Sequence, residues 1–125
     1  MPGPADLTEA LARLRARFAA ASGETVAVYR RIADELERDP GAADALDGLR
    51  REAHKLFGTA GSYGFHEASR LAGALERTAE QWHADPVIDR ARRAAMVREF
   101  ADAVASALTL PDRPAPEGPA RPSGG

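Results

Sequence analysis

Apolar residues recur every three or four positions along most of this chain, a spacing that gathers them on one face of an α-helix. Five stripes of this kind follow one another. Their members, stripe by stripe, are Leu7, Leu11, Leu14 and Phe18; Val26, Tyr29, Ile32 and Leu36; Leu46, Leu49, Ala53, Leu56 and Ala60; Ala68, Leu71, Leu75, Thr78 and Trp82; and Val87, Ala91, Ala94, Val97, Phe100 (or Ala101), Val104 and Leu108. No run of β-branched or aromatic residues alternates with period two, as a strand would. The pattern therefore predicts an all-α protein.

Breakers between the stripes set the expected topology. The A-A-A-S-G-E run near residue 20 predicts a turn, with Ser22 capping the helix that follows. A D-P-G run at 39–41 ends the second stripe, and a D-P pair at 85–86 ends the fourth. Since short connections favour antiparallel neighbours, we expect an antiparallel up-down four-helix bundle. The additional N-terminal helix would be a fifth packing element or an end cover.

The composition of the chain changes at residue 110. Residues 110–125 contain five prolines and three glycines, which excludes a packed helix there. The whole chain of 125 residues is long enough for one core. We therefore expect one helical domain over residues 5–109 and a disordered tail or linker over residues 110–125.

Charge and composition exclude several classes of function. The formal net charge of −2 gives no electrostatic reason to expect binding to nucleic acid or to an anionic membrane. The chain has no cysteine, which excludes disulfides and thiolate metal sites. No stretch approaches the roughly 18 apolar residues of a membrane span, and the first residues lack the pattern of a secretory signal. We expect a cytoplasmic protein and a monomer.

The segment A-H-K-L-F-G-T-A-G-S-Y-G-F, residues 53–65, combines a histidine with three glycines within and just after the third stripe. Glycine in a helix interior costs roughly 1 kcal/mol relative to alanine, whereas a whole domain is stable by only about 5–15 kcal/mol. Three glycines nevertheless follow His54, at positions 58, 61 and 64. They indicate that the backbone there must stay free of side chains, so that another molecule can approach it closely. Gly64 is also a candidate for the left-handed cap of this helix.

A helical wheel places His54 at the edge of the apolar face. With the middle of the third stripe at zero and 100° per residue, His54 lies near about 100°. Gly61 and Gly58 share that side, near about 80° and 140°. Arg50 and Asp47 lie one to two turns earlier, near about 60° and 120°. The wheel predicts an exposed imidazole with bare backbone on one side and charges on the other.

An exposed imidazole in this setting suits phosphoryl transfer. A neutral imidazole is a good nucleophile near pH 7, because its reference pKa is about 6.5. It can attack the phosphorus of an acyl phosphate and hold the group as a phosphoramidate, provided that the donor's active site reaches the ring in line. Large side chains at positions 58 or 61 would obstruct that approach. The ammonium of Lys55 would help to offset the phosphoryl charge.

Residues 53–65 resemble the signature of histidine-containing phosphotransfer (HPt) domains, the modules of bacterial two-component phosphorelays, which runs roughly A-H-x-L-x-G-[ST]-[AS]-[GA]-x-[FYL]-G. The residues that fit it are Ala53, His54, Leu56, Gly58, Thr59, Ala60, Gly61, Tyr63 and Gly64. The L-A-G-A-L-E run at 71–76 is similar to the family's next helix. The resemblance covers about residues 40–80, and the flanking helices fit it only as generic amphipathic helices.

The resemblance implies a four-helix bundle in which His54 is the phosphorylated residue and Gly58 permits close approach. The implied partners are receiver domains of response regulators or hybrid histidine kinases, whose phospho-aspartate exchanges with His54. The chain would be a phosphoryl carrier with no kinase or hydrolase activity of its own. It would need no metal or cofactor of its own, because Mg²⁺ is expected in the partner receiver.

One position departs from the family pattern. Many members carry lysine or arginine three residues after the histidine, where this chain has Phe57. On the wheel Phe57 lies near about 40°, where it would pack in part and offer a partner an apolar contact. The cations left near the histidine are Lys55, Arg50 and Arg51. The candidate site is therefore His54 with a surrounding surface made of Lys55, Phe57, Gly58, Gly61, Arg50, Arg51 and Asp47.

Other residues have plainer interpretations. Tyr29 and Trp82 stand at stripe positions and are expected in the core, and the Y-G-F run at 63–65 is expected to close the bundle near the glycine turn. His66 and His83 are expected to be solvated. No two histidines are four residues apart, so no zinc site is expected. The wheel puts Gly73 on the solvent side of its helix, where nothing in the sequence explains a glycine.

Two alternatives to phosphoryl transfer stay open. The same face would serve a docking or adaptor module that binds receiver or kinase domains without being phosphorylated. The chain would otherwise be a purely structural helical bundle. A hydrolase is not expected, because the sequence has no Ser-His-acid order, no cluster of paired carboxylates and no phosphate-binding glycine loop.

Overall fold

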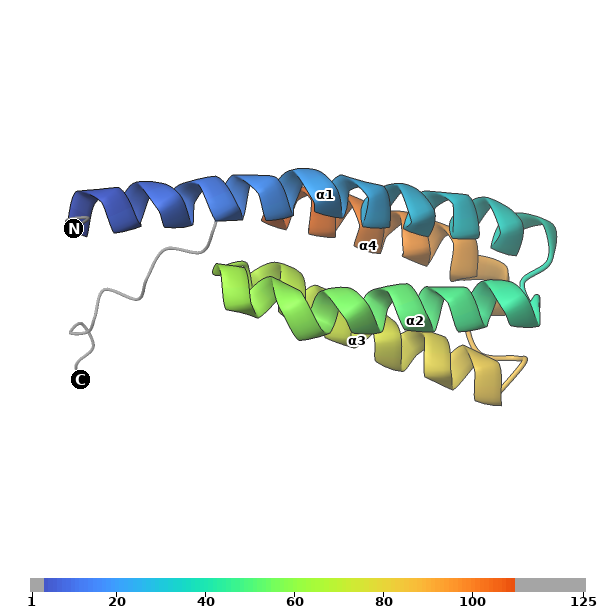
Figure 1. Ribbon diagram of the computed structural model, residues 1–125. Helices are drawn as coiled ribbons and strands as arrows, with labels where there is room; N and C mark the ends of the chain where they lie inside the picture. The colour runs from blue at the N-terminus through green and yellow to red at the C-terminus, as the bar shows by residue number, and fades with distance from the viewer. Residues whose placement is uncertain (1–3, 110–125) are drawn as a thin grey trace, which may run out of the picture.

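A computed structural model describes residues 4–109 of the chain, which form four α-helices joined by short connections (Figure 1). The helices are α1 (Pro4–Arg38), α2 (Ala43–Thr59), α3 (His66–Ala84) and α4 (Arg93–Ala107), with short 3₁₀ turns η1 (Ala60–Tyr63) and η2 (Arg90–Arg92). The described residues include no strand, and the predicted all-α class is confirmed. The tail expected over residues 110–125 lies outside the described part.

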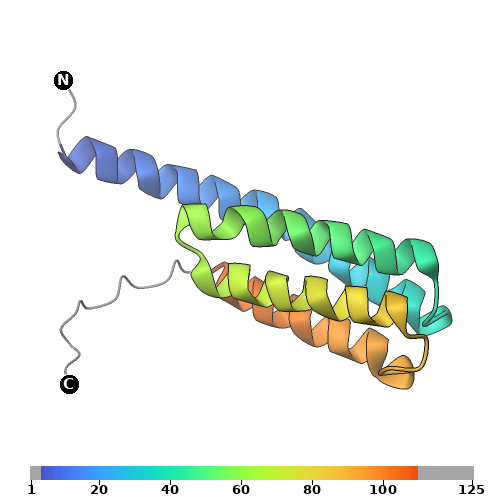
Figure 2. The same cartoon turned by 90° about the horizontal axis from the view of Figure 1, so that it is seen from below.

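The four helices run up and down in turn and lie side by side around one core (Figure 2). The contacts are most extensive between α2 and α3 and then between α1 and α4. The largest fully buried side chains are Trp82, Arg93, Tyr29, Phe65, Leu36, Leu49, Leu75, Val97 and Val104. The core positions predicted for Tyr29 and Trp82 are confirmed, and so is the antiparallel bundle.

The turn predicted near residue 20 is wrong, because α1 continues through it to Arg38. The helix stays in phase across the predicted break: Phe18 is half-buried, and Ser22 and Val26 follow it at four-residue steps with 5% and 6% exposure. Ser22 therefore fills a small core position and caps nothing. A lone Gly23 without a proline lowers helix propensity by only about 1 kcal/mol, which packing of this face overcomes.

The first third of α1 reaches beyond the other helices (Figures 1 and 2). Leu7, Leu11 and Leu14 are 62%, 43% and 46% exposed, so this segment is neither a fifth packing element nor an end cover. Contact with the bundle begins at Arg15, whose Nε donates to the carbonyl of Tyr63 at 3.0 Å. Aromatic packing begins at Phe18, whose ring stacks on that of Tyr63 with centroids 4.5 Å apart. Phe65 lies 5.8 Å from Phe18, and these three rings close the bundle beside the glycine turn, as predicted.

Gly64 ends the α2–η1 segment in the left-handed region with φ of +87°, as predicted. Its N–H bonds the carbonyl of Gly61 at 3.0 Å, and the N–H of Phe65 bonds the carbonyl of Ala60 at 3.0 Å. These bonds satisfy carbonyls that a helix end leaves free. The turn reverses the chain tightly, which brings α3 back along α2.

The other end of the bundle depends on Arg93, which the sequence did not single out. The fifth stripe was expected to begin at Val87, but Val87 is 77% exposed and α4 starts only at Arg93. The guanidinium of Arg93 is fully buried and donates to the carbonyls of Ile88, Pro40 and Asp85 at 2.9, 2.6 and 2.9 Å. One cation thus fixes both the α1–α2 connection and the α3–α4 connection, since buried carbonyls require donors.

Across residues 4–109, none of the helices has both the length and the apolar character that crossing a bilayer requires.

Replacing Gly23 by alanine tests the continuity of α1. An added Cβ would meet nothing within 4 Å, and alanine is favoured over glycine in a helix interior by about 1 kcal/mol. We expect Gly23→Ala to raise the free energy of unfolding by about that amount in urea denaturation. A loss of stability would show that the chain turns at this position, as its sequence suggested.

Candidate functional site

His54 lies on the exposed edge of α2. Its neighbours Ala53 and Leu56 are 0% and 3% exposed and hold α2 against the core. The His54 side chain itself is 65% exposed. The structure therefore places the imidazole at the border between core and solvent, where the helical wheel put it.

The imidazole of His54 is bonded to α3 through one ring nitrogen. Its Nδ1 lies 2.9 Å from Oε2 of Glu76, whose side chain is only 15% exposed. Because a carboxylate oxygen can only accept, Nδ1 carries the proton and donates it to Glu76. In the neutral form of the ring the lone pair is then on Nε2, which bonds no residue in the described part of the chain. The contact fixes both the tautomer and the direction of the nucleophilic nitrogen.

Glu76 was not among the predicted site residues. The L-A-G-A-L-E run at 71–76 was noted only as a likeness to another helix. A signal existed in principle, because antiparallel packing of the third and fourth stripes fixes which residues face each other. The exact register depends on the turn at residues 60–65, and the stripes alone do not determine it.

The same register brings further pairs together along the seam between α2 and α3. Phe57 faces Gly73 one turn beyond the His54 contact, where an added Cβ on Gly73 would lie 2.8 and 2.9 Å from ring carbons of Phe57. A Cβ on Gly61 would lie 3.8 Å from Oγ of Ser69. The prediction that Gly73 faces solvent is wrong: the residue is buried under the Phe57 ring.

Gly58 leaves an open space on the histidine's side of α2. It stands one turn after His54, it is exposed, and an added Cβ would meet nothing within 4 Å. Gly61 is partly buried, and a Cβ there would make ordinary contacts with His66 and Ser69. Of these two glycines, Gly58 is therefore the one that keeps the approach to the imidazole unobstructed.

Two of the predicted cations, Arg50 and Arg51, form ion pairs with an acidic residue and not with the imidazole. Asp47 pairs with both Arg50, at 3.0 Å, and Arg51. The hydrogen bond from Arg50, with the charges of Arg51, Arg50 and His83, holds the pKa of Asp47 below its usual value despite some desolvation. The structure thus places Asp47, Arg50 and Arg51 together as a charged cluster one to two turns before His54.

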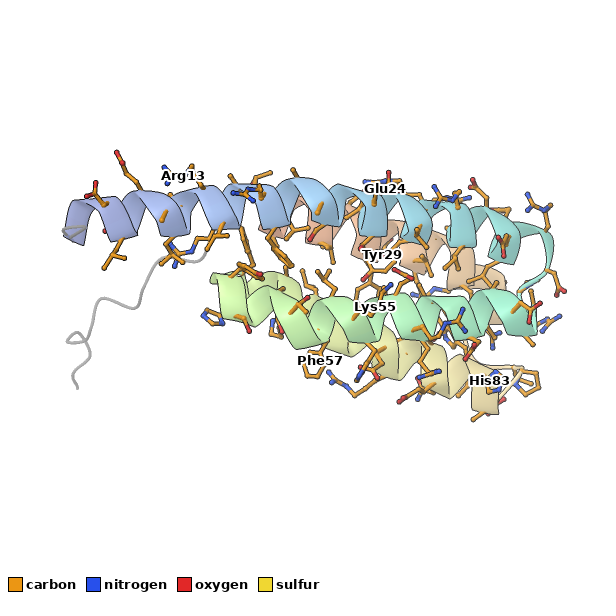
Figure 3. All side chains as sticks on the ribbon, viewed as in Figure 1. Arg13, Glu24, Tyr29, Lys55, Phe57 and His83 are labelled. Atoms are coloured by element: carbon orange, nitrogen blue, oxygen red, sulfur yellow. The ribbon has the colours of Figure 1, made fainter. Side chains whose placement is uncertain are left out.

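Lys55 points to another face of α2. Its ammonium pairs with Glu52 at 3.0 Å, and it borders a hollow between α1 and α2 that Phe18 and Ser22 also line. Phe57, by contrast, lies at the side of α2 next to α3 (Figure 3). The sequence neighbours of His54 are therefore divided between two faces, and only Phe57 shares the α2–α3 seam.

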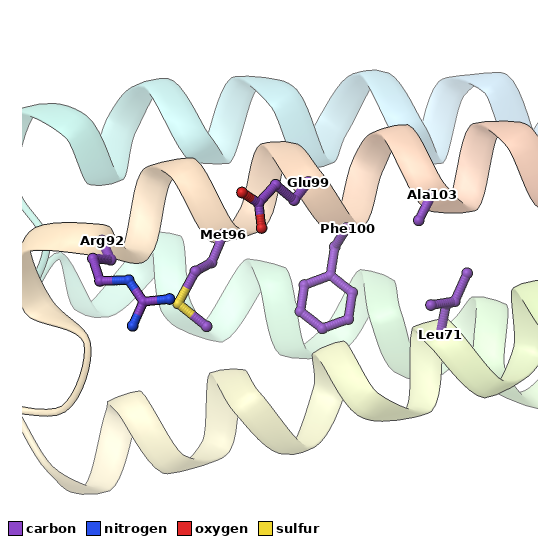
Figure 4. A pocket seen from close by; sticks show the side chains of 6 residues that line it. All are labelled: Leu71, Arg92, Met96, Glu99, Phe100 and Ala103. Atoms are coloured by element: carbon purple, nitrogen blue, oxygen red, sulfur yellow. The ribbon is translucent and has the colours of Figure 1, made fainter.

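A hollow of about 260 Å³ lies elsewhere, between α3 and α4 (Figure 4). It is lined by Leu71, Arg92, Met96, Glu99, Phe100 and Ala103. None of these is a predicted site residue, and His54 does not border it. Within residues 4–109, no three His, Cys, Asp or Glu side chains gather as metal ligands would.

Comparison with known proteins identifies the class. The family model for the Hpt domain matches residues 5–109. The chain belongs to the Hpt domain family, and it is a histidine phosphotransfer module of two-component signalling.

One curated relative is similar over a shorter stretch. Chemotaxis protein CheA of Halobacterium salinarum is 52% identical over 42 residues, which make up 34% of this chain and 6% of that protein. The match thus takes in only a small part of the relative's length. No solved structure matches the chain significantly.

Removing the Glu76 carboxylate tests whether it prepares the imidazole. Without its acceptor the ring can rotate and adopt either tautomer, so we expect Glu76→Ala to slow phosphoryl uptake at least about tenfold, which corresponds to roughly 1.4 kcal/mol of activation free energy. The measurement is the single-turnover rate of label transfer from a phosphorylated receiver. Glu80→Ala, one turn further along α3 and exposed, is the matched control. Equal rates in the two variants would contradict the role of Glu76.

Proposed function

We propose that Nε2 of His54 accepts a phosphoryl group from the phospho-aspartate of one receiver domain and passes it to the aspartate of a second receiver domain. The observation that carries the proposal is the 2.9 Å bond from Nδ1 to Glu76 on an imidazole that is 65% exposed. Because Nδ1 is engaged by Glu76, the lone pair of Nε2 is free for a partner that approaches from solvent. The membership of the Hpt family supports the same reaction.

The transfer step needs no proton movement. The Nε2 lone pair attacks phosphorus, the bond between phosphorus and the aspartyl oxygen breaks, and the aspartate leaves as a carboxylate. The ring retains its proton on Nδ1 and becomes a phosphorylated imidazolium. Glu76, already bonded to that proton, stabilises the positive charge that develops on the ring. Reversal breaks the N–P bond and restores the neutral tautomer.

The remaining requirements of the reaction fall to the partner. Phosphoryl transfer depends mainly on positioning and on neutralising the equatorial oxygens. On this proposal the receiver contributes Mg²⁺ and the acidic pocket, and the chain contributes a nucleophile on a rigid helix. The domain is then a carrier with no kinase or hydrolase activity of its own. Its partners are receiver domains of response regulators or of hybrid histidine kinases.

One observation favours a second function, a docking module that binds receiver or kinase domains without being phosphorylated. The three predicted cations, Lys55, Arg50 and Arg51, pair with acidic residues rather than surround the imidazole. Phe57 stands where many relatives carry a cation and offers an apolar contact instead. Binding to receivers with no transfer of label would support this alternative.

A transfer assay with His54→Gln distinguishes the two functions. The wild-type protein is mixed with a panel of phosphorylated receivers from the same genome, and its label is tested for acid lability and base stability. Glutamine keeps a polar side chain on the exposed surface but cannot form a phosphoramidate, so we expect the variant to fold and to acquire no label. His66→Gln and His83→Gln, both exposed, are the controls and should be labelled normally. Label that persists on the His54 variant would refute the proposal.

Filling the open space at Gly58 tests the close approach. The side chain of Gly58→Leu would project beside the imidazole, so we expect transfer to weaken at least about tenfold while the helix gains up to about 1 kcal/mol. Gly23→Leu, at a glycine on α1 that also has nothing within 4 Å, controls for the change in helix propensity. Unchanged transfer rates in Gly58→Leu would show that the partner does not approach across this position.

A further inference from the structure

We infer that Gly73, Phe57 and Arg77 form a docking contact beside His54 that selects receivers carrying an apolar side chain next to a carboxylate. This inference rests on the proposed function and specifies its partner. Phe57 and Arg77 make the contact, and Gly73 acts as a positioning residue through Phe57.

The first observation is the fit of the Phe57 ring onto bare helix backbone. Ring carbons of Phe57 occupy the space where a Cβ on Gly73 would sit, at 2.8 and 2.9 Å from that position. Real Cβ atoms do not approach other atoms so closely, so any other residue at 73 would displace the ring. This contact explains a glycine in the middle of α3 that the sequence left unexplained.

The backbone of Phe57 is held to α3 as well. Ser69 donates from Oγ to the Phe57 carbonyl at 2.9 Å. That carbonyl belongs to the last turn of α2, where helix geometry leaves carbonyls without partners. Phe57 is therefore held at two points: Ser69 bonds its backbone carbonyl, and its ring packs on the backbone of Gly73. A side chain fixed in this way loses little entropy when a partner binds it.

The second observation concerns charge. Nη1 of Arg77 lies 3.5 Å from the same virtual Cβ position, so guanidinium and ring flank one point on α3. Arg77 is exposed and forms no ion pair with any residue between 4 and 109. It follows Glu76 directly in sequence, on the seam that carries the imidazole. A cation is therefore present on the α2–α3 seam that also carries His54, but it comes from α3 instead of position 57.

The chemistry of the partner follows from this pair. Phe57 stays 45% exposed although its inner face is covered, and an aromatic ring with one free face is a strong anchor for an apolar side chain. The free guanidinium suits a carboxylate, which it can bind in bidentate form. A receiver whose surface offers both groups at this spacing should dock more tightly than one that offers two acidic groups.

The test is a double-mutant cycle on docking. Dissociation constants are measured by titrating the chain with the unphosphorylated receiver that the wild type binds most tightly in the panel. We expect Phe57→Ala, Arg77→Gln and Gly73→Ala each to weaken binding about tenfold or more, as anchor residues do. In the Phe57→Ala background, Gly73→Ala should have no further effect, because it acts only through the ring.

Matched controls separate docking from general effects. Gly23→Ala changes helix propensity without a contact, Val87→Ala removes a remote exposed apolar side chain, and Arg31→Gln removes a remote exposed charge. All three should bind the receiver as the wild type does. Labelling of His54 by phosphoramidate, a small donor that needs no docking, should stay within about twofold of wild type in Gly73→Ala.

Each outcome decides between the hypotheses. Equal dissociation constants for Gly73→Ala and Gly23→Ala, or an undiminished effect of Gly73→Ala in the Phe57→Ala background, would overturn the inference. A parallel loss of phosphoramidate labelling would also overturn it, because the residues would then act on the imidazole. A wild-type protein that binds receivers but transfers no label would refute the proposed phosphotransfer alone, and the binding cycle would still test the docking contact.

Discussion

The antiparallel register of α2 against α3 is the constraint on which the site depends. It places the Glu76 carboxylate 2.9 Å from Nδ1 of His54, and one turn away it seats Phe57 on Gly73. The turn that sets this register is short and ends at Gly64 in the left-handed region, with φ of +87°. A shift of the register by one turn would leave the imidazole without its acceptor and force the aromatic ring off the helix. The geometry of the turn and the reactivity of the imidazole are therefore linked.

The site is simple because the reaction demands little of this chain. An imidazole at the edge of a helix, with its tautomer fixed and bare backbone at Gly58 beside it, is a sufficient nucleophile. Rigidity comes from the packing of α2 and from the buried guanidinium of Arg93, which joins the two connections at the opposite end of the bundle. On the proposed function, the partner brings the metal and the acidic pocket to a surface that hardly needs to move.

Features that depend on a single helix were predictable from the sequence. The period of the apolar residues gave the bundle, and the wheel put His54 at the edge of the core. The exposed position of Gly58 also followed from the periodicity of its helix. The same reasoning failed for Gly73, because a side chain from the facing helix, Phe57, covers it. Ser22 and Gly23 are typical of a turn, but the unbroken phase of the apolar face around them keeps α1 helical through both.

Features that depend on two helices together were not predictable in the same way. Glu76 and Gly73 acquire their roles only when α3 lies in one particular register on α2, and Arg93 only when two connections meet at the start of α4. Periodicity indicates which face of a helix is buried, but it does not indicate which residue of the neighbouring helix each buried residue contacts. The family signature at residues 53–65 located the imidazole, and the likeness at residues 71–76 gave no role to Gly73 or Glu76. Residue 93 lay outside both.

The most direct test of the central claim is the position of the proton and of the phosphoryl group on the His54 ring. Long-range ¹H–¹⁵N spectra of histidine-labelled protein, recorded before and after phosphorylation, measure both. We expect a proton on Nδ1 in the free protein and, after transfer, phosphorus on Nε2 with the Nδ1 proton retained. A free protein with its proton mainly on Nε2, or a product phosphorylated on Nδ1, would contradict it.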